Sequence, residues 1–92
     1  MPSQLISAIK RNQNVSLDDL KRFQDAKIDF NETDRRGNTA LTLAAERGMK
    51  DLVLNLLQLP SILIQGKAIE LADKNNHREI AEIIHDKVVK LA

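Results

Sequence analysis

The sequence holds few residues that could catalyse a reaction or bind a metal. It contains two histidines and no cysteine, and His77 and His85 stand eight residues apart in one predicted helix. Two histidines that share a metal on one helix face are usually four residues apart. The adjacent acids Asp18 and Asp19 stand at a predicted helix start, where carboxylates favour the helix dipole. We therefore expect a protein that is not an enzyme and that uses no cofactor and no metal.

Two adjacent arginines, Arg35 and Arg36, are the residues best suited to recognition. They fall in the polar, turn-rich segment 27–38, KIDFNETDRRGN, which predicts an extended loop or hairpin. Guanidinium groups bind carboxylates as planar forks and are enriched at the energetic centres of protein interfaces. The pair is either a solvated turn or a partner contact. The basic pairs at 10–11 and 21–22 are interpreted as solvated helix faces.

The composition is that of one small domain without a strong overall charge. The 92 residues carry 14 Lys+Arg and 13 Asp+Glu, a formal charge of +1. This balance provides no general attraction to nucleic acid or to an anionic membrane. Phe23 and Phe30 are the only aromatic residues, which disfavours base stacking as a binding mode. The most apolar stretch, 52–64, is shorter than the roughly 20 residues of a spanning helix. We expect a cytoplasmic protein, with delivery into a host cell left open.

The spacing of apolar residues predicts six helices in three pairs, with the first helix of each pair short. Helix starts can be capped by Ser3, Ser16 and Thr39. Asp19 stands three residues after Ser16, where a capping box usually has the longer glutamate or glutamine. Glycine adopts the left-handed conformation without a steric penalty, so Gly48 is predicted to end the third helix. The segment 75–76, Asn-Asn, takes the same turn in the last pair.

The three helix pairs overlay as a repeat. The segments SQLISAIKRN, TALTLAAERG and KAIELADKNN align when Ser3, Thr39 and Lys67 are superimposed, at spacings of 36 and 28 residues. Periods of about 33 residues are typical of stacked helical repeats. The central unit resembles an ankyrin repeat, whose pattern is D-x-x-G-x-T-P-L-H-x-A-A-x-x-G followed by a helix with paired leucines. The matching residues are Asp34, Gly37, Thr39, Leu41, Ala44, Ala45, Gly48, Val53, Leu56 and Leu57.

The resemblance is specific over residues 28–60 and looser elsewhere. Ala40 and Thr42 stand where the family has proline and histidine, which removes a preset backbone angle and the ring hydrogen bonds. The lead-in to the third unit is about five residues short, so we expect a finger loop to be missing there. The first unit carries about three extra residues near its turn.

The resemblance implies an all-α ankyrin-repeat solenoid of three helix-turn-helix repeats with a short finger loop. The approximate repeats are 3–32, 33–62 and 63–92. First helices of neighbouring repeats pack side by side in this family, and small residues such as Ala44 and Ala45 let their axes approach. Ala8 and Ala72 are the counterparts in the flanking units.

The resemblance also implies a protein-binding module, such as an adaptor, an inhibitor or a bacterial effector. Its contact surface would be the concave face formed by the finger and the first helices. Phe30 stands where the family has a small apolar residue, so it either packs in the core or contacts a partner. The implied partner-binding residues are Phe30, Glu32, Arg35, Arg36, Asn38, Thr42, Glu46 and Arg47.

Two alternatives remain open. The last predicted helix is more apolar than one buried stripe needs, with Ile80, Ile83, Ile84, Val88, Val89 and Leu91. A structural protein that forms homo-oligomers through this helix would explain the pattern, as would a partner that covers it or a chain that continues past Ala92. The other alternative is a nucleic-acid-binding helical domain, which the charge balance disfavours.

Overall fold

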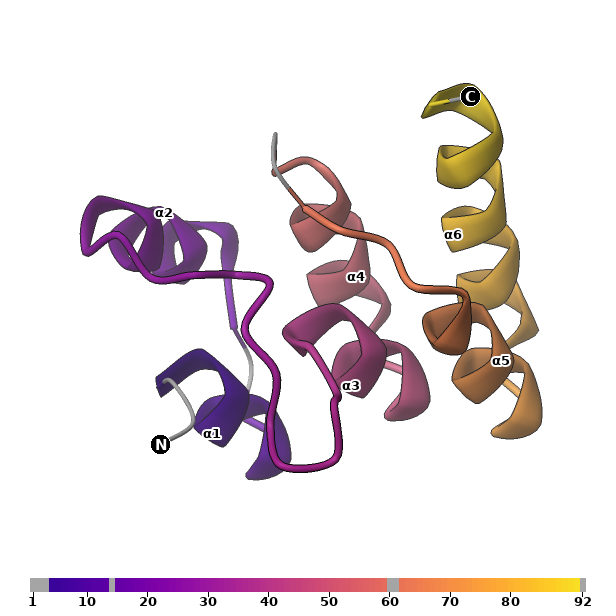
Figure 1. Ribbon diagram of the computed structural model, residues 1–92, viewed down its shortest axis with the longest axis horizontal. Helices are drawn as coiled ribbons and strands as arrows, with labels where there is room; N and C mark the ends of the chain where they lie inside the picture. Colours follow the sequence, from indigo (N-terminus) through magenta and orange to yellow (C-terminus); the bar gives the residue numbers. More distant parts are fainter. Residues whose placement is uncertain (1–3, 14, 60–61, 92) are drawn as a thin grey trace.

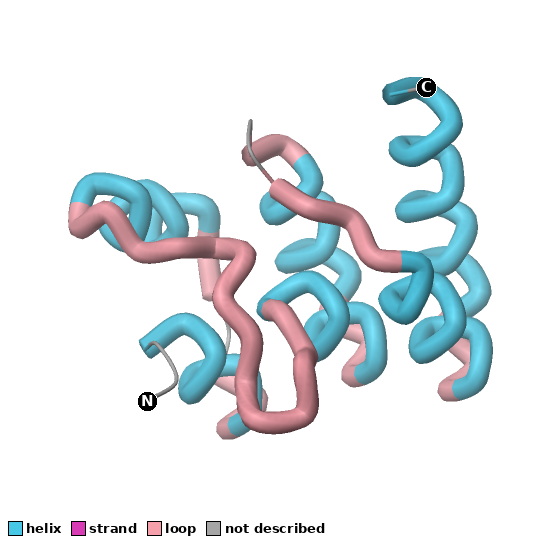
Figure 2. Tube along the Cα trace, viewed as in Figure 1, coloured by secondary structure: helices cyan, strands magenta, loops and turns pink. Residues whose placement is uncertain are grey.

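The computed structural model describes residues 4–13, 15–59 and 62–91, together with the side chains of all but the last of these. Within these residues the chain forms helices and loops without strands, as Figures 1 and 2 show. The helices are α1 (Gln4–Lys10), α2 (Leu17–Asp25), α3 (Ala40–Glu46), α4 (Lys50–Leu57), α5 (Gly66–Lys74) and α6 (Arg78–Leu91). The all-helical prediction is confirmed for the described residues, and the 27–38 segment is a loop. None of these helices is long and apolar enough to cross a membrane.

The helices lie in two rows (Figure 1). The first row contains α1, α3 and α5, and α3 lies between the other two and contacts both. The second row contains α2, α4 and α6, and α4 contacts both of its neighbours. The middle pair is therefore covered on two sides, whereas each outer pair has one uncovered side.

The same tight turn ends the first helix of each pair. Asn12, Gly48 and Asn76 have positive φ angles of 59°, 73° and 64°. The following residue in each case donates its backbone N–H to a carbonyl five residues earlier, which is the pattern of a Schellman motif. These bonds are Gln13 N to Ala8 O (3.0 Å), Met49 N to Ala44 O (3.0 Å) and His77 N to Ala72 O (2.7 Å). The backbone thus repeats at the 36- and 28-residue spacings of the sequence overlay.

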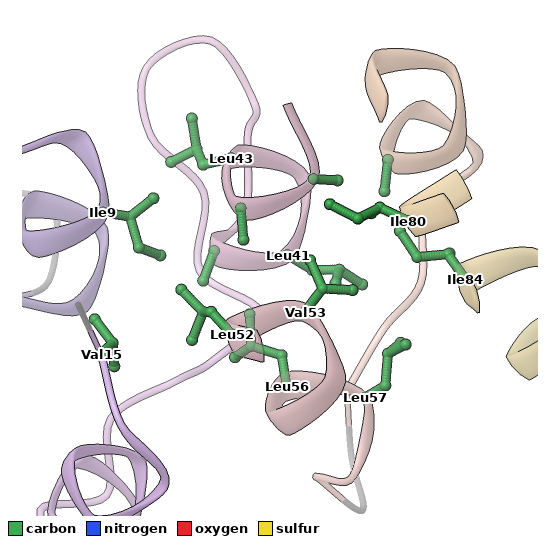
Figure 3. Packing of buried hydrophobic residues seen from close by; sticks show 14 of the residues in the cluster. Ile9, Val15, Leu41, Leu43, Leu52, Val53, Leu56, Leu57, Ile80 and Ile84 are labelled. Atoms are coloured by element: carbon green, nitrogen blue, oxygen red, sulfur yellow. The ribbon is translucent and has the colours of Figure 1, made fainter. Parts of the chain in front are cut away.

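Alanines of the first-row helices are buried where these helices pack on one another. Ala44, Ala45 and Ala72 have no exposed surface, as the sequence predicts, and Ala40 and Ala68 are also buried. Ala8 is half-buried because α1 lies at the end of its row. Between the rows the side chains are larger. Figure 3 shows Leu41, Val53 and Leu56 gathered between α3 and α4, with Ile9 pointing toward them from α1.

Local signals set the helix starts and the linkers. Asp19 N donates to Ser16 Oγ at 3.2 Å and Ser16 N donates to Asp19 Oδ2 at 3.0 Å, which confirms the capping box. Thr42 N donates to Thr39 Oγ1 at 3.2 Å, which confirms the Thr39 cap. Ser3 lies outside the described residues.

The turn between α1 and α2 has six residues, whereas the turns within the other two helix pairs have three each. The prediction of about three extra residues in the first unit is therefore confirmed. The linker before α5, residues 58–65, is shorter than the linker before α3, residues 26–39.

Candidate protein-binding surface

Asp34 organises the 27–38 loop, which we call the finger. Its side chain is only 4% exposed. The Asp34 Oδ1 atom accepts the backbone N–H groups of Arg36 and Asn38, each at 2.9 Å, and Oδ2 lies 3.0 Å from Lys10 Nζ. The Asp34 N–H donates to the Asn38 carbonyl at 2.9 Å and closes the turn, in which Gly37 has a φ of 79°. One carboxylate therefore shapes the finger tip and attaches it to α1.

The Asp34 carboxyl stays ionised well below neutral pH. Burial by itself would raise the pKa of Asp34, but hydrogen bonds from Asn38, Lys10 and Arg36 outweigh burial and hold the pKa at about 2. At neutral pH its negative charge is matched by the Lys10 ammonium group.

Two further contacts hold the finger against the third helix pair. Leu63 N donates to Asn31 Oδ1 at 2.8 Å, which joins the start of the finger to the linker before α5. Lys67 Nζ lies 3.4 Å from the Arg36 carbonyl oxygen, which joins the tip to the first turn of α5. The finger is thus attached on both sides of α3, and Arg35 and Arg36 at its tip are exposed to solvent.

Glu46 and Arg47 lie at the C-terminal end of α3. Glu46 is half-buried, and Arg47 is the exposed residue that follows the helix. Arg47 Nη1 donates to Asn12 Oδ1 at 2.7 Å, so the turns after α1 and α3 are linked by a side-chain hydrogen bond. Both residues remain candidates for a contact surface.

The structure removes Asn38 and Thr42 from the predicted contact surface. Asn38 is 8% exposed and Thr42 is 0% exposed. Every residue of α3 from 40 to 45 is buried, because this helix lies between two neighbours in its row. Thr42 Oγ1 donates to the Thr39 carbonyl at 2.9 Å, so it strengthens the helix start even though the family's histidine is absent. A side chain with no exposed surface has no area to offer a partner.

Phe30 and Glu32 lie at the start of the finger and are both half-buried. Phe30 packs against the hydrophobic core and also lines a pocket of about 210 Å³ together with Ile28, Leu59 and Ile62. The Glu32 N–H donates to the Asp29 carbonyl at 3.1 Å within the bend of the loop. Phe30 therefore has a core contact, and its remaining surface faces the pocket.

Sequence reasoning missed the lysines that flank the finger. Lys10 was assigned to a solvated helix face, but it pairs with Asp34, and Lys67 contacts the finger tip. The repeat overlay did contain a signal. It places Arg11 at the position of Arg47, in neighbouring turns, and it aligns Lys67 with Thr39, the residue that follows the finger.

The histidines are separate from this surface. His77 lies just before α6, one residue outside the helix predicted to contain it, and its ring packs on Gly48, where an added Cβ would lie 2.6 Å from His77 Cε1. His85 is exposed on α6. No group of three or more His, Asp or Glu side chains among the described residues could hold a metal ion.

Comparisons with protein-family models, with curated proteins and with solved structures found no match for this chain. The arrangement of its own residues is therefore the basis for inferring function.

Proposed function

We propose that this chain is a non-enzymatic protein-binding module with ankyrin-type repeats, which engages its partner through the finger and the neighbouring helix ends. The proposal is supported by the two helix rows, the turn that follows the first helix of each pair at Asn12, Gly48 and Asn76, and the buried alanines of the first row. Arg35, Arg36, Glu46 and Arg47 are the proposed contacts, with the exposed parts of Phe30 and Glu32 beside them.

The observation that carries the proposal is the way the finger is held. A loop of this length would lose conformational entropy on binding if it were free, and that loss weakens affinity. Here Lys10, Leu63 and Lys67 attach the finger to three other segments before any partner arrives. Two arginines at the tip of a fixed loop form a preorganised recognition element, because their backbone conformation is already set.

Affinity purification from a native lysate, read by mass spectrometry, tests the proposal. The baits are the wild type, an Arg35→Glu, Arg36→Glu variant and a control Lys21→Glu, Lys90→Glu variant with the same change in charge. Lys21 and Lys90 are exposed on α2 and α6 and lie outside the finger. We expect a partner protein that the wild type and control retain and the finger variant loses. A partner retained equally by all three baits would place the interface elsewhere.

The exposed end of α6 supports a second candidate function, self-association in a structural role. Ile80 and Ile84 are buried, but Val88 and Val89 are 40% and 58% exposed. In Figure 1 the C-terminal end of α6 extends past the end of α4, so its last turns have no neighbouring helix. Sedimentation equilibrium of the wild type and a Val88→Ser, Val89→Ser variant tests this function. An apparent mass that rises with concentration only in the wild type would favour self-association. A wild-type mass that equals the monomer mass at every concentration would exclude it.

A further inference from the structure

Exposed basic side chains lie at the finger tip, at the C-terminal ends of α1 and α3 and at the start of α5. We call this set the basic finger surface, and all of its members are exposed. It comprises Lys10, Arg11, Arg35, Arg36, Arg47 and Lys67.

Three contacts bring these segments together. Lys10 at the end of α1 pairs with Asp34, and Lys67 in α5 contacts the carbonyl of Arg36, so cations lie on both sides of the tip. Arg47 binds Asn12, the residue that follows Arg11, which brings the turns after α1 and α3 together. The basic finger surface is therefore a product of folding, because its members are spread over positions 10 to 67.

The local charge differs from the charge of the whole chain. The protein carries a formal charge of only +1, so its cations are balanced by acids, of which Asp18, Asp19 and Glu82 lie on α2 and α6. Glu32 in the finger and Glu46 at the end of α3 are acids close in sequence to the basic finger surface. Asp34 and Lys10 neutralise each other, so the net positive charge at the tip comes from Arg35, Arg36 and Lys67. Exposed charges act over a Debye length of about 10 Å at 0.1 M salt, so a ligand at the tip experiences the local positive field.

We propose that the partner docks through an acidic segment, a run of aspartate and glutamate carboxylates that binds across the finger tip. This inference rests on the proposed function and specifies the chemistry of the partner. Arg35 and Arg36 present planar forks that match carboxylate geometry, and Lys67 adds positive charge on the α5 side of the tip. Complementary charge of this kind increases the rate of association and selects the partner.

The same surface is poorly equipped for nucleic acid, which also carries negative charge. Binding to single strands relies on aromatic side chains on which bases stack. The chain has no Trp or Tyr, and Phe23 and Phe30 are half-buried against the hydrophobic core. The basic finger surface therefore lacks the stacking contacts of a single-strand binder, and the DNA probes below compare phosphate with carboxylate directly.

Fluorescence anisotropy with defined probes tests the inference. The first probe is a labelled peptide of alternating glutamate and alanine, and its control has glutamine in place of every glutamate. Labelled single-stranded and duplex DNA oligonucleotides of matched charge are the other probes. The proteins are the wild type, an Arg35→Gln, Arg36→Gln variant and a Lys21→Gln, Lys90→Gln control, each verified as folded by circular dichroism.

We expect the glutamate peptide to bind the wild type and the glutamine peptide not to bind. Loss of two exposed ion pairs should weaken binding about tenfold in the finger variant and leave the control unchanged. Higher salt should weaken the glutamate complex further, because these charges are exposed. Tighter binding to either DNA, equal binding of the two peptides, or equal weakening of both protein variants would overturn the inference.

The two proposals fail in different ways. If affinity purification yields a partner that depends on Arg35 and Arg36 but the glutamate peptide does not bind, the acidic-segment inference is wrong and the proposed function stands. If no protein is retained through the finger in that experiment, the proposed function itself is wrong.

Discussion

Replacing Asp34 with asparagine tests the account of the finger most directly. The substitution keeps the size of the side chain and one oxygen that can accept the N–H groups of Arg36 and Asn38. It replaces the oxygen that faces Lys10 Nζ at 3.0 Å with an NH₂ group. Two hydrogen-bond donors then face each other, so the Lys10 contact is lost and the attachment of the finger to α1 weakens.

The size of the effect follows from the pKa of Asp34. The pKa is about 2 in the folded protein, compared with an ordinary value of 3.8. At about 1.4 kcal/mol per pKa unit, the charged form contributes about 2–3 kcal/mol to the free energy of unfolding at neutral pH. Lys10 is 43% exposed, so solvent screens that end of the interaction, and asparagine retains part of the hydrogen bonding. We therefore expect Asp34→Asn to cost about 1–2 kcal/mol.

The pH dependence provides a second test. Because the folded pKa is lowered, the contribution of Asp34 is fully present above pH 3.8 and is lost as pH falls through about 2. The difference in stability between wild type and variant should therefore be constant from pH 7 to about 5. It should shrink by about half near pH 3, where Asp34 is mostly protonated in the unfolded state and still mostly ionised in the folded state.

Urea denaturation followed by circular dichroism measures both quantities. Asp29→Asn is the matched control, because Asp29 is an exposed carboxylate of the same loop that accepts the Asn31 N–H at 2.9 Å. We expect the control to change the free energy of unfolding by less than about 0.5 kcal/mol. An Asp34→Asn variant as stable as the wild type at pH 7, or a difference that grows as pH falls, would refute the reasoning.

Three other substitutions test the packing, the turns and the caps by thermal and urea denaturation. Ala44→Leu should overpack the first helix row and cost about 1–3 kcal/mol, and an unchanged melting temperature would contradict the close approach of the helices. Gly48→Ala should cost about 1–2 kcal/mol, because alanine disfavours a φ of 73° and its Cβ meets the His77 ring; a neutral result would show that the ring moves aside freely. Ser16→Ala should cost about 1 kcal/mol through loss of the α2 cap, and full retention of stability would show that Asp19 caps the helix alone.

The helices and turns were predictable because their signals are local. The i to i+4 hydrogen bonds of a helix and the conformational freedom of Gly48 depend on a few neighbouring residues, so spacing and residue type suffice to place them. The caps at Ser16 and Thr39 were predictable for the same reason, since a cap joins residues three positions apart. Arg35 and Arg36 were placed correctly at an exposed loop tip, because a polar segment rich in turn residues rarely packs inside a small domain.

The contact surface was less predictable, because burial depends on what packs from elsewhere in the chain. Thr42 and Glu46 are four residues apart on one helix and both were expected on the surface. Thr42 is buried because α3 lies between two neighbours, whereas Glu46 is half-buried at the end of the helix. Asn38 is buried because the finger closes over it with Asp34. None of these neighbours is specified by the spacing within the segment itself.

The sequence by itself therefore determined the six helices, the turns that repeat at Asn12, Gly48 and Asn76, and the small residues at the helix contacts. Each of these follows from interactions within a few residues or from side-chain size. Only the tertiary structure decided that Lys10 and Lys67 flank the finger tip. Lys10 is 24 residues before its partner Asp34, and Lys67 is 31 residues after its partner Arg36. Such contacts form when the helix rows pack, and packing depends on all the side chains of the rows together.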